Sequence, residues 1–148
     1  MALKRFPNWL ELLDPCVQQA HWGKKTFQWG IFDCALFVCD CILTITGVDP
    51  GKDFRGKYTT QEEAAAIMQQ FAGGGIEALA VKMAAQLQMP EIKPVTFAQR
   101  GDIVLVSNSR NDRALGIVGF DARFVLCASE QGLARVPMKR WLRAWKAG

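Results

Sequence analysis

The segment from residue 34 to residue 46 constrains the fold of this chain more than any other. Read as a helix it is apolar on nearly every side, with apolar residues at Leu36, Phe37, Val38, Ile42, Leu43 and Ile45. Asp33 precedes it as an N-cap, and Gly47 follows it where a helix-ending glycine is expected. A helix without a polar face is stable only when other elements cover it on several sides. We therefore predict a buried central helix around which the rest of the chain packs.

Cys34 occupies the first position of this predicted helix. Free N–H groups and the positive end of the helix dipole favour a thiolate there, which is typical of a nucleophilic cysteine. The negative charge of Asp33 and the apolar neighbours of Cys34 oppose that effect. A thiol nucleophile also needs a base, and the leaving group needs a proton donor. The chain has one histidine, His21, and it precedes the helix.

The rest of the sequence divides into helices followed by strands. Further helices are predicted over 8–21, 61–71 and 76–88, from apolar periodicity and capping signals. Pro15 should break the first of these into two short turns. Thr60 and Glu63 form a capping-box pattern in which Glu63 reaches back to the Thr60 amide. Strands are predicted over 102–107, 114–120, 124–128 and 133–136.

The order of these elements predicts one α+β domain over residues 1–148. It has a helical part over 1–92, a β meander over 100–137 and a C-terminal tail over 138–148. The tail should form a short helix or strand whose two tryptophans, Trp141 and Trp145, close the core or form a protein-binding ridge. N-terminal helices should pack on a small antiparallel sheet.

Composition limits the classes of partner. Half of the residues are hydrophobic, 22% are charged and the net charge is +4, which is ordinary for a globular domain. Lys4, Arg5, Lys139 and Arg140 are interpreted as parts of solvated faces, with an acidic partner surface as the alternative. The sequence has no dense basic stripe of the kind that would predict nucleic-acid binding. No secretory signal and no membrane-spanning stretch is found in the sequence.

The five cysteines are interpreted as reduced thiols. Cys39 and Cys41 are expected in the core, because their offsets from Cys34 do not place the three sulfurs on one helix face as metal ligands. Cys16 is expected to be a similar core residue or to lie at the surface. The sequence predicts no metal and no cofactor.

Five short motifs occur in an order that resembles a group of small phage and prophage proteins related to the NlpC/P60 peptidase fold. They are Trp-Gly-x-x-Asp-Cys at 29–34, Thr-Gly-x-Asp at 46–49, Arg-Gly-x-Tyr at 55–58, Ala-Gln-Arg-Gly-Asp at 98–102 and a tryptophan near the C-terminus. The resemblance implies a papain-like, NlpC/P60-type domain. It also implies synthesis in the bacterial cytoplasm without a signal peptide, and a place in the virion tail if the chain is phage-encoded.

The resemblance places Cys34 at the position of the family's nucleophile. Active members carry a histidine at the start of the strand that follows the Gly-Asp strand, and here that position is Ala114. The family's third polar residue falls on Leu126 or Cys127. The resemblance therefore implies a degenerate peptidase site in which only the cysteine is retained.

The leading hypothesis is a phage tail-tip, baseplate or tail-assembly component that keeps the fold without catalysis and binds other tail proteins. One alternative is a cysteine hydrolase of peptidoglycan stem peptides. It would use Cys34 with an unorthodox base or donor, either His21 folded back or Tyr58. Cys127 could also face Cys34 and form a disulfide or bind a metal with it. The other alternative is a peptide- or glycan-binding module whose open cleft beside Cys34 is lined by Trp29, Asp33 and Tyr58.

Overall fold

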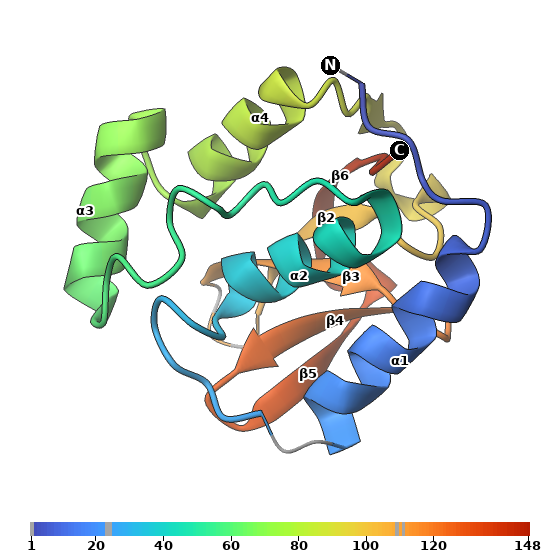
Figure 1. Ribbon diagram of the computed structural model, residues 1–148, viewed down its shortest axis with the longest axis horizontal. Coiled ribbons are helices and arrows are strands. Elements are labelled where there is room, and N and C mark those ends of the chain that lie inside the picture. The colour runs from blue at the N-terminus through green and yellow to red at the C-terminus, as the bar shows by residue number, and fades with distance from the viewer. Residues whose placement is uncertain (1, 23–24, 109, 111) are drawn as a thin grey trace.

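The computed structural model describes residues 2–22, 25–108, 110 and 112–148, and the side chains of all of these except His21 and Trp22. Within these residues, four helices pack on a six-stranded antiparallel sheet, which confirms the mixed α+β class (Figure 1). The helices are α1 (Trp9–Trp22), α2 (Cys34–Thr46), α3 (Gln61–Ala72) and α4 (Ile76–Gln86). The strands are β1 (Glu91–Ile92), β2 (Ile103–Ser107), β3 (Arg113–Val118), β4 (Phe124–Ser129), β5 (Gly132–Pro137) and β6 (Trp141–Trp145).

Helix α2 is the buried central helix that the sequence predicts. The Asp33 carboxylate accepts a hydrogen bond from the Leu36 N–H at 2.9 Å and so caps the first turn. Gly47 ends the helix in the left-handed conformation, with φ of 80°, and its N–H donates to the Leu43 carbonyl. Helix α1 lies beside α2, and the sheet lies behind both (Figure 1). This arrangement fixes where the N-terminus of α2, and therefore Cys34, meets the sheet.

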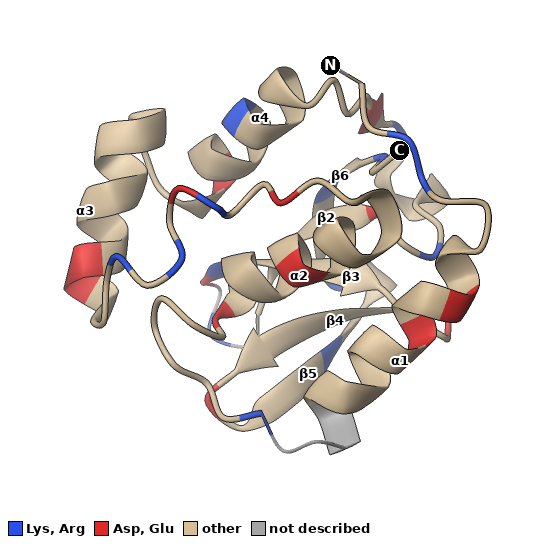
Figure 2. Ribbon diagram, viewed as in Figure 1, with Lys and Arg blue, Asp and Glu red and all other residues tan. Residues whose placement is uncertain are grey.

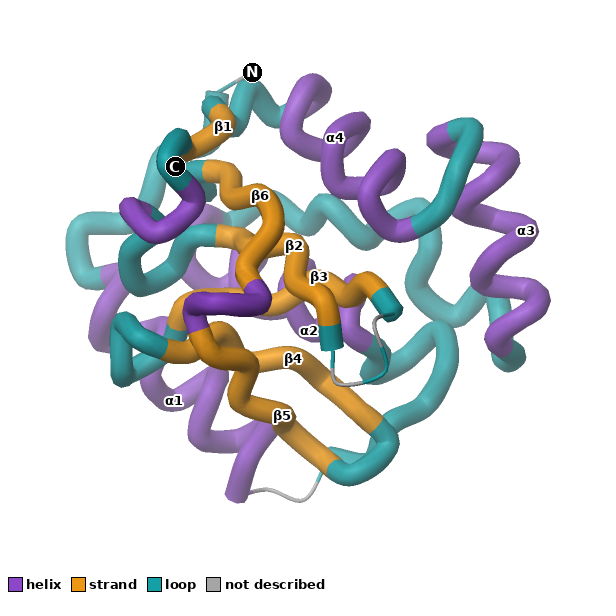
Figure 3. Tube along the Cα trace, turned by 180° about the vertical axis from the view of Figure 1, so that it is seen from behind, coloured by secondary structure: helices purple, strands orange, loops and turns teal. Residues whose placement is uncertain are grey.

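The C-terminal segment is an internal part of the sheet. The strand order is β1-β6-β2-β3-β4-β5, so β6 lies between β1 and β2, as Figure 3 shows from behind. Residues 138–148 therefore form no separate tail, and the segment between α4 and β2 contains the edge strand β1. The sequence alone misses this pairing because β1 is only two residues long.

Trp141 and Trp145 both close the core, with 5% and 3% of their surface exposed, which excludes the predicted protein-binding ridge. Trp145 packs with residues of α2 and α4. Trp141 packs in the far-face cluster, defined here as the buried side chains on the sheet face away from α2: Ala98, Val104, Val106, Val118, Val125, Cys127, Val136, Trp141 and Ala144. The pairing of β6 with β2 shifts register between Leu105 and Val106, and this shift turns the two indoles toward opposite faces.

Helix α1 continues through Pro15, so the predicted break there is wrong. Proline removes one N–H donor from the helix, but Leu13 and Val17 on either side of it are 0% and 2% exposed. Both pack against the face of α2 that carries Phe37 and Ile45. This burial outweighs the lost hydrogen bond.

The N-terminus of α3 differs in one detail from the predicted capping box. The Thr60 hydroxyl accepts a hydrogen bond from the Glu63 N–H at 3.1 Å, as predicted. The Glu63 carboxylate accepts from the Thr59 N–H at 2.9 Å, rather than from that of Thr60. The cap therefore includes one more residue than the pattern predicts.

Arg5 is not part of a solvated face, because its guanidinium joins the two ends of the chain. It donates to the Ala147 carbonyl at 2.8 Å, to the Arg100 carbonyl at 3.1 Å and to the Asp102 carboxylate at 2.7 Å. The remaining charges support the interpretation of solvated faces. Figure 2 shows Lys and Arg spread over many elements with Asp and Glu among them. In the part of the chain that the structure describes, no helix is both long and apolar enough to span a bilayer.

Candidate functional site

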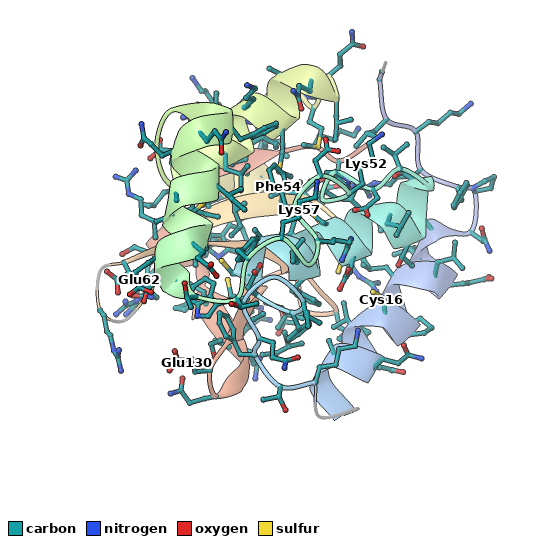
Figure 4. The ribbon with its side chains drawn as sticks, turned by 60° about the vertical axis from the view of Figure 1, so that its left-hand side comes forward. Cys16, Lys52, Phe54, Lys57, Glu62 and Glu130 are labelled. Atoms are coloured by element: carbon teal, nitrogen blue, oxygen red, sulfur yellow. The ribbon has the colours of Figure 1, made fainter. Side chains whose placement is uncertain are left out.

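A groove of about 1230 Å³ opens beside the N-terminus of α2. Apolar side chains of α3 and α4 line it on one side, and the ends of β3, β4 and β5 line it on the other. In Figure 4, which turns this side forward, Glu62 marks the first turn of α3 and Glu130 marks the turn between β4 and β5. Trp29, Asp33, Cys34 and Tyr58 all line the groove, as the hypothesis of a binding module requires.

The carboxylate of Asp33 organises the turn that leads into α2. It is 2% exposed and accepts three hydrogen bonds. The donors are the Leu36 N–H at 2.9 Å, the Gly30 N–H at 3.1 Å and the Tyr58 hydroxyl at 2.5 Å. Asp33 therefore fixes the position of its neighbour Cys34 and holds the phenol of Tyr58 at the groove.

Close backbone packing brings Tyr58 to this position. Gly30 has φ of +84°, and a Cβ there would lie 2.0 Å from the Tyr58 carbonyl oxygen. The Gly56 N–H donates to the Gly30 carbonyl at 2.8 Å. The Trp-Gly-x-x-Asp-Cys and Arg-Gly-x-Tyr segments therefore pack against each other at Gly30, where a larger residue does not fit.

The loop that carries Tyr58 is anchored by Arg55. Its guanidinium pairs with both oxygens of Asp49, at 2.8 and 3.1 Å, and with Asp40 on α2 at 2.7 Å. Burial and the hydrogen bond to Asp33 raise the pKa of Tyr58. The phenol is therefore a hydrogen-bond donor at neutral pH and not a base.

Cys34 lies at the groove as a protonated thiol. Part of the residue is exposed, but protein atoms surround its sulfur, and this burial raises the pKa of the thiol to about 11. The negative charge of Asp33 adds to the rise, and hydrogen bonds from backbone N–H groups, chiefly that of Leu115, oppose it. Burial and the neighbouring carboxylate thus outweigh the helix N-terminus, and the thiolate is rare at pH 7.

The other predicted site residues are distributed unevenly. Ala114, at the start of β3, lines the groove and has no group that could accept a proton. Cys127 is 4% exposed in the far-face cluster and does not line the groove. Burial, followed by the charge of Cys34, raises the pKa of Cys127. The side chain of His21 lies outside the described part of the chain, so the hypothesis that it folds back stays a prediction.

All five cysteines are free, and the described residues contain no group of three or more His, Cys, Asp or Glu side chains able to hold a metal ion. Cys39 and Cys41 are buried core residues, as predicted. The sequence analysis did not assign the groove walls. Ala64, Ile67 and Met68 on α3 recur at helical spacing, but that signal does not reveal which part of the molecule they face.

Comparison with protein families gives one finding. The family described as "Domain of unknown function (DUF6950)" matches residues 4–147. No curated protein matches the sequence.

Proposed function

The chain belongs to the DUF6950 family, and on this premise we propose that it is a non-catalytic, NlpC/P60-like component of a phage tail tip or baseplate, or of tail assembly. In this role the fold is a packing unit that contacts other tail proteins. The vestigial cleft remains as a groove beside Cys34. The phage assignment rests on the resemblance of the five motifs and their order.

Two features of the fold support the NlpC/P60 likeness. A cysteine is the first residue of the central helix and lines the groove. The start of β3, the strand that follows β2 in the antiparallel sheet, lines the same groove. The short motifs also make contacts with one another. Asp33 from the first motif accepts from Tyr58 in the third, and Asp49 from the second pairs with Arg55 in the third. The first three motifs are therefore joined by these contacts in one region of the structure.

The observation that carries the non-catalytic proposal is the state of the Cys34 thiol. Its pKa is raised to about 11, and Ala114 stands where the resemblance expects a base. The carboxylate of the neighbouring Asp33 accepts hydrogen bonds from three donors. A protonated thiol is a weak nucleophile, and amide cleavage also needs a proton donor for the leaving amine.

The experiment is a digestion assay on purified peptidoglycan with the wild-type chain and Cys34→Ser. We expect neither protein to release new amino groups, while an active NlpC/P60 hydrolase does so in parallel. If the wild-type chain cleaves stem peptides and Cys34→Ser does not, the hydrolase alternative replaces this proposal. In a phage that carries the gene, Cys34→Ser should leave tail assembly and infectivity intact.

The open groove specifically favours the second candidate, a peptide- or glycan-binding module. Ala65 is exposed and lines the groove, whereas its neighbour Ala66 is exposed and does not. Ala65→Trp should therefore fill the groove, and Ala66→Trp is its matched control. Co-sedimentation with peptidoglycan sacculi should fall at least about tenfold for Ala65→Trp alone, since roughly 1.4 kcal/mol of lost contact has this effect. If Ala65→Trp and Ala66→Trp bind sacculi equally well, the groove is not the binding site for peptides or glycans.

A further inference from the structure

Helix α3 lies at the rim of the molecule, as the views from both sides in Figures 1 and 3 show. Only Ala64 of its twelve residues is buried. We propose that α3 is a lid that moves away from the groove to admit a ligand, and that contacts of Phe71 hold it closed. This inference rests on the second candidate function, in which the groove binds a ligand, and its first test needs no ligand.

The inner side of α3 borders open space for part of its length. Ile67 and Met68 are partly buried against the core, yet they line the groove together with Ala65. Helix α4, which continues the same wall, is fixed more firmly, because it buries four residues: Leu79, Ala80, Met83 and Ala84. Segments with few buried apolar contacts open locally at a lower free energy than the core. Outward movement of α3 therefore requires less free energy than movement of α4.

Both ends of α3 are attached through exposed backbone. The glycines at 73–75 join it to α4, and a Cβ at Gly73 or Gly75 would meet no atom within 4 Å. No neighbouring group among the described residues therefore restrains the backbone at these two positions. At the other end Tyr58 is 7% exposed and fixed by its hydrogen bond to Asp33, whereas residues 59–60 are exposed. The fixed part of the chain thus ends at Tyr58 and begins again with α4.

Phe71, in the last turn of α3, makes the contacts that hold the lid closed. Its ring packs edge-on against Phe54, with centroids 4.8 Å apart, and Phe54 is 8% exposed in the anchored loop. Its carbonyl accepts a hydrogen bond at 2.6 Å from the ammonium group of Lys82 on α4, which also lies 4.5 Å from the centre of its ring. The last carbonyls of a helix lack partners within it, and a cation there is favourable. Because Lys82 is exposed, this bond can break without unfolding the core.

The first measurement is amide hydrogen exchange of the wild-type chain without ligand, followed by peptide mass spectrometry. Amides of α3 should exchange at least about tenfold faster than those of α4, because the lid opens while the rest of the chain stays folded. Lys82→Met should accelerate exchange in α3 by a further factor of about two to ten, the range for one hydrogen bond, and leave α2 unchanged. Lys4→Met, at an exposed position near the N-terminus, is the matched control and should change neither helix.

Two results of this measurement would overturn the lid. One is exchange in wild-type α3 that is no faster than in α4, and it requires no variant. The other is an equal acceleration of α2 and α3 by Lys82→Met, which would mean that the substitution weakens the whole fold.

The second measurement asks whether the opening leads into the groove, with anilinonaphthalenesulfonate as an apolar fluorescent probe. Lys82→Met, checked for folding by near-UV circular dichroism, should raise the probe's fluorescence at least about twofold over wild type and Lys4→Met, because more apolar surface is accessible. Adding Ala65→Trp, which fills the groove, should abolish this gain. A gain that survives Ala65→Trp, or no gain in Lys82→Met, contradicts the proposal.

Failure of the lid and failure of the binding function give different results. If α3 exchanges as slowly as α4, the lid is removed even when sacculi bind. If α3 exchanges rapidly and sacculi do not bind, the binding function is removed, and with it the role of the lid in admitting this ligand.

Discussion

The five thiols of this chain differ because of their surroundings and not because of their position on a helix. Cys34 has the helix N-terminus, yet burial and Asp33 raise its pKa to about 11. Cys16 lies inside a helix, yet the neighbouring Cys41 thiol lowers its pKa to about 6. At Cys34, burial first and then the Asp33 carboxylate therefore outweigh the favourable groups at the end of the helix.

The first prediction concerns the ionisation of Cys34. In a Cys16→Ser background, the rate of Cys34 alkylation by iodoacetamide should stay low at pH 7 and rise toward a midpoint near pH 11, because the folded chain disfavours the thiolate. The pH dependence of the rate, read by peptide mass spectrometry, gives the apparent pKa. A midpoint below the ordinary thiol value of about 8.5 would favour the hydrolase alternative.

The second prediction concerns the hydroxyl of Tyr58. Tyr58→Phe removes a donor from the buried Asp33 carboxylate. Because hydrogen bonds to charged groups contribute about 1.5–3 kcal/mol, the free energy of unfolding should fall by that amount in urea titrations. The same substitution in an Asp33→Asn background should have a smaller effect, because the charge is gone. Equal effects in both backgrounds would mean that the bond contributes little.

The loop between α2 and α3 behaves as an element of its own, although it has no helix or strand. Arg55 ties it to α2 through Asp40, and the Gly56 N–H ties it to Gly30. Phe54 packs edge-on against Phe71 of α3, with ring centroids 4.8 Å apart. These contacts fix the loop against α2, α3 and the turn at Gly30, and thereby set the position of Tyr58.

The third prediction tests this anchor. Arg55→Ala leaves Asp40 and Asp49 without their partner, so amide hydrogen exchange in residues 48–58 should accelerate. The cost in unfolding free energy should be about 1 kcal/mol, because the guanidinium is 30% exposed and its ion pairs are partly screened. Arg55→Lys, which cannot pair with two carboxylates through a planar fork, should give an intermediate exchange rate. Unchanged exchange in Arg55→Ala would show that the glycine and aromatic contacts suffice.

The sequence predicted the helices and strands whose ends are marked by capping or turn-forming residues. The Asp33 and Gly47 caps gave the bounds of α2, and turn-forming residues separated β2, β3, β4 and β5 close to their observed limits. Where long-range packing decides, the local pattern was insufficient. Pro15 remains helical because its neighbours pack on α2, and β1 exists because β6 pairs with it.

The sequence predicted which residues lie at the candidate site, but it did not predict the groove that they line. Trp29, Asp33, Cys34, Ala114 and Tyr58 line one groove, as the motifs suggested. The groove walls come from helices and strands far apart in the sequence, and no local pattern shows which of them meet. Cys127 does not line the groove, whereas Val136 of the same far-face cluster does, so the position of a residue along its strand matters as well as its face.

The fourth prediction concerns the network that joins both ends of the chain to the turn before β2. Burial raises the pKa of Asp102 even though Arg5 lowers it. Arg5→Met removes the only cation bonded to this carboxylate among the described residues. Ionised Asp102 is then unpaired, so the free energy of unfolding should fall by about 3 kcal/mol at pH 7.

The sign of the pH dependence follows from the raised pKa of Asp102. A folded-state pKa above the unfolded value gives stability that is present in acid and lost as pH rises through the folded value. Removing Arg5 raises that pKa further, so the loss in Arg5→Met should shrink on acidification, measured as the difference from wild type in urea at each pH. Arg5→Met with Asp102→Asn should recover part of the loss at pH 7. If Arg5→Met lowers the free energy of unfolding by the same amount at pH 7 and at acidic pH, the loss comes from packing instead.

The same network has a geometric consequence for assembly. Arg5 brings the first residues against Ala147, and Figure 1 shows the two termini close together, whereas the residues that line the groove all come from positions 27–140. Any polypeptide joined to either end would therefore project from the same side of the molecule. A tether at either end would therefore hold one and the same region of the molecule, the region that Arg5 closes.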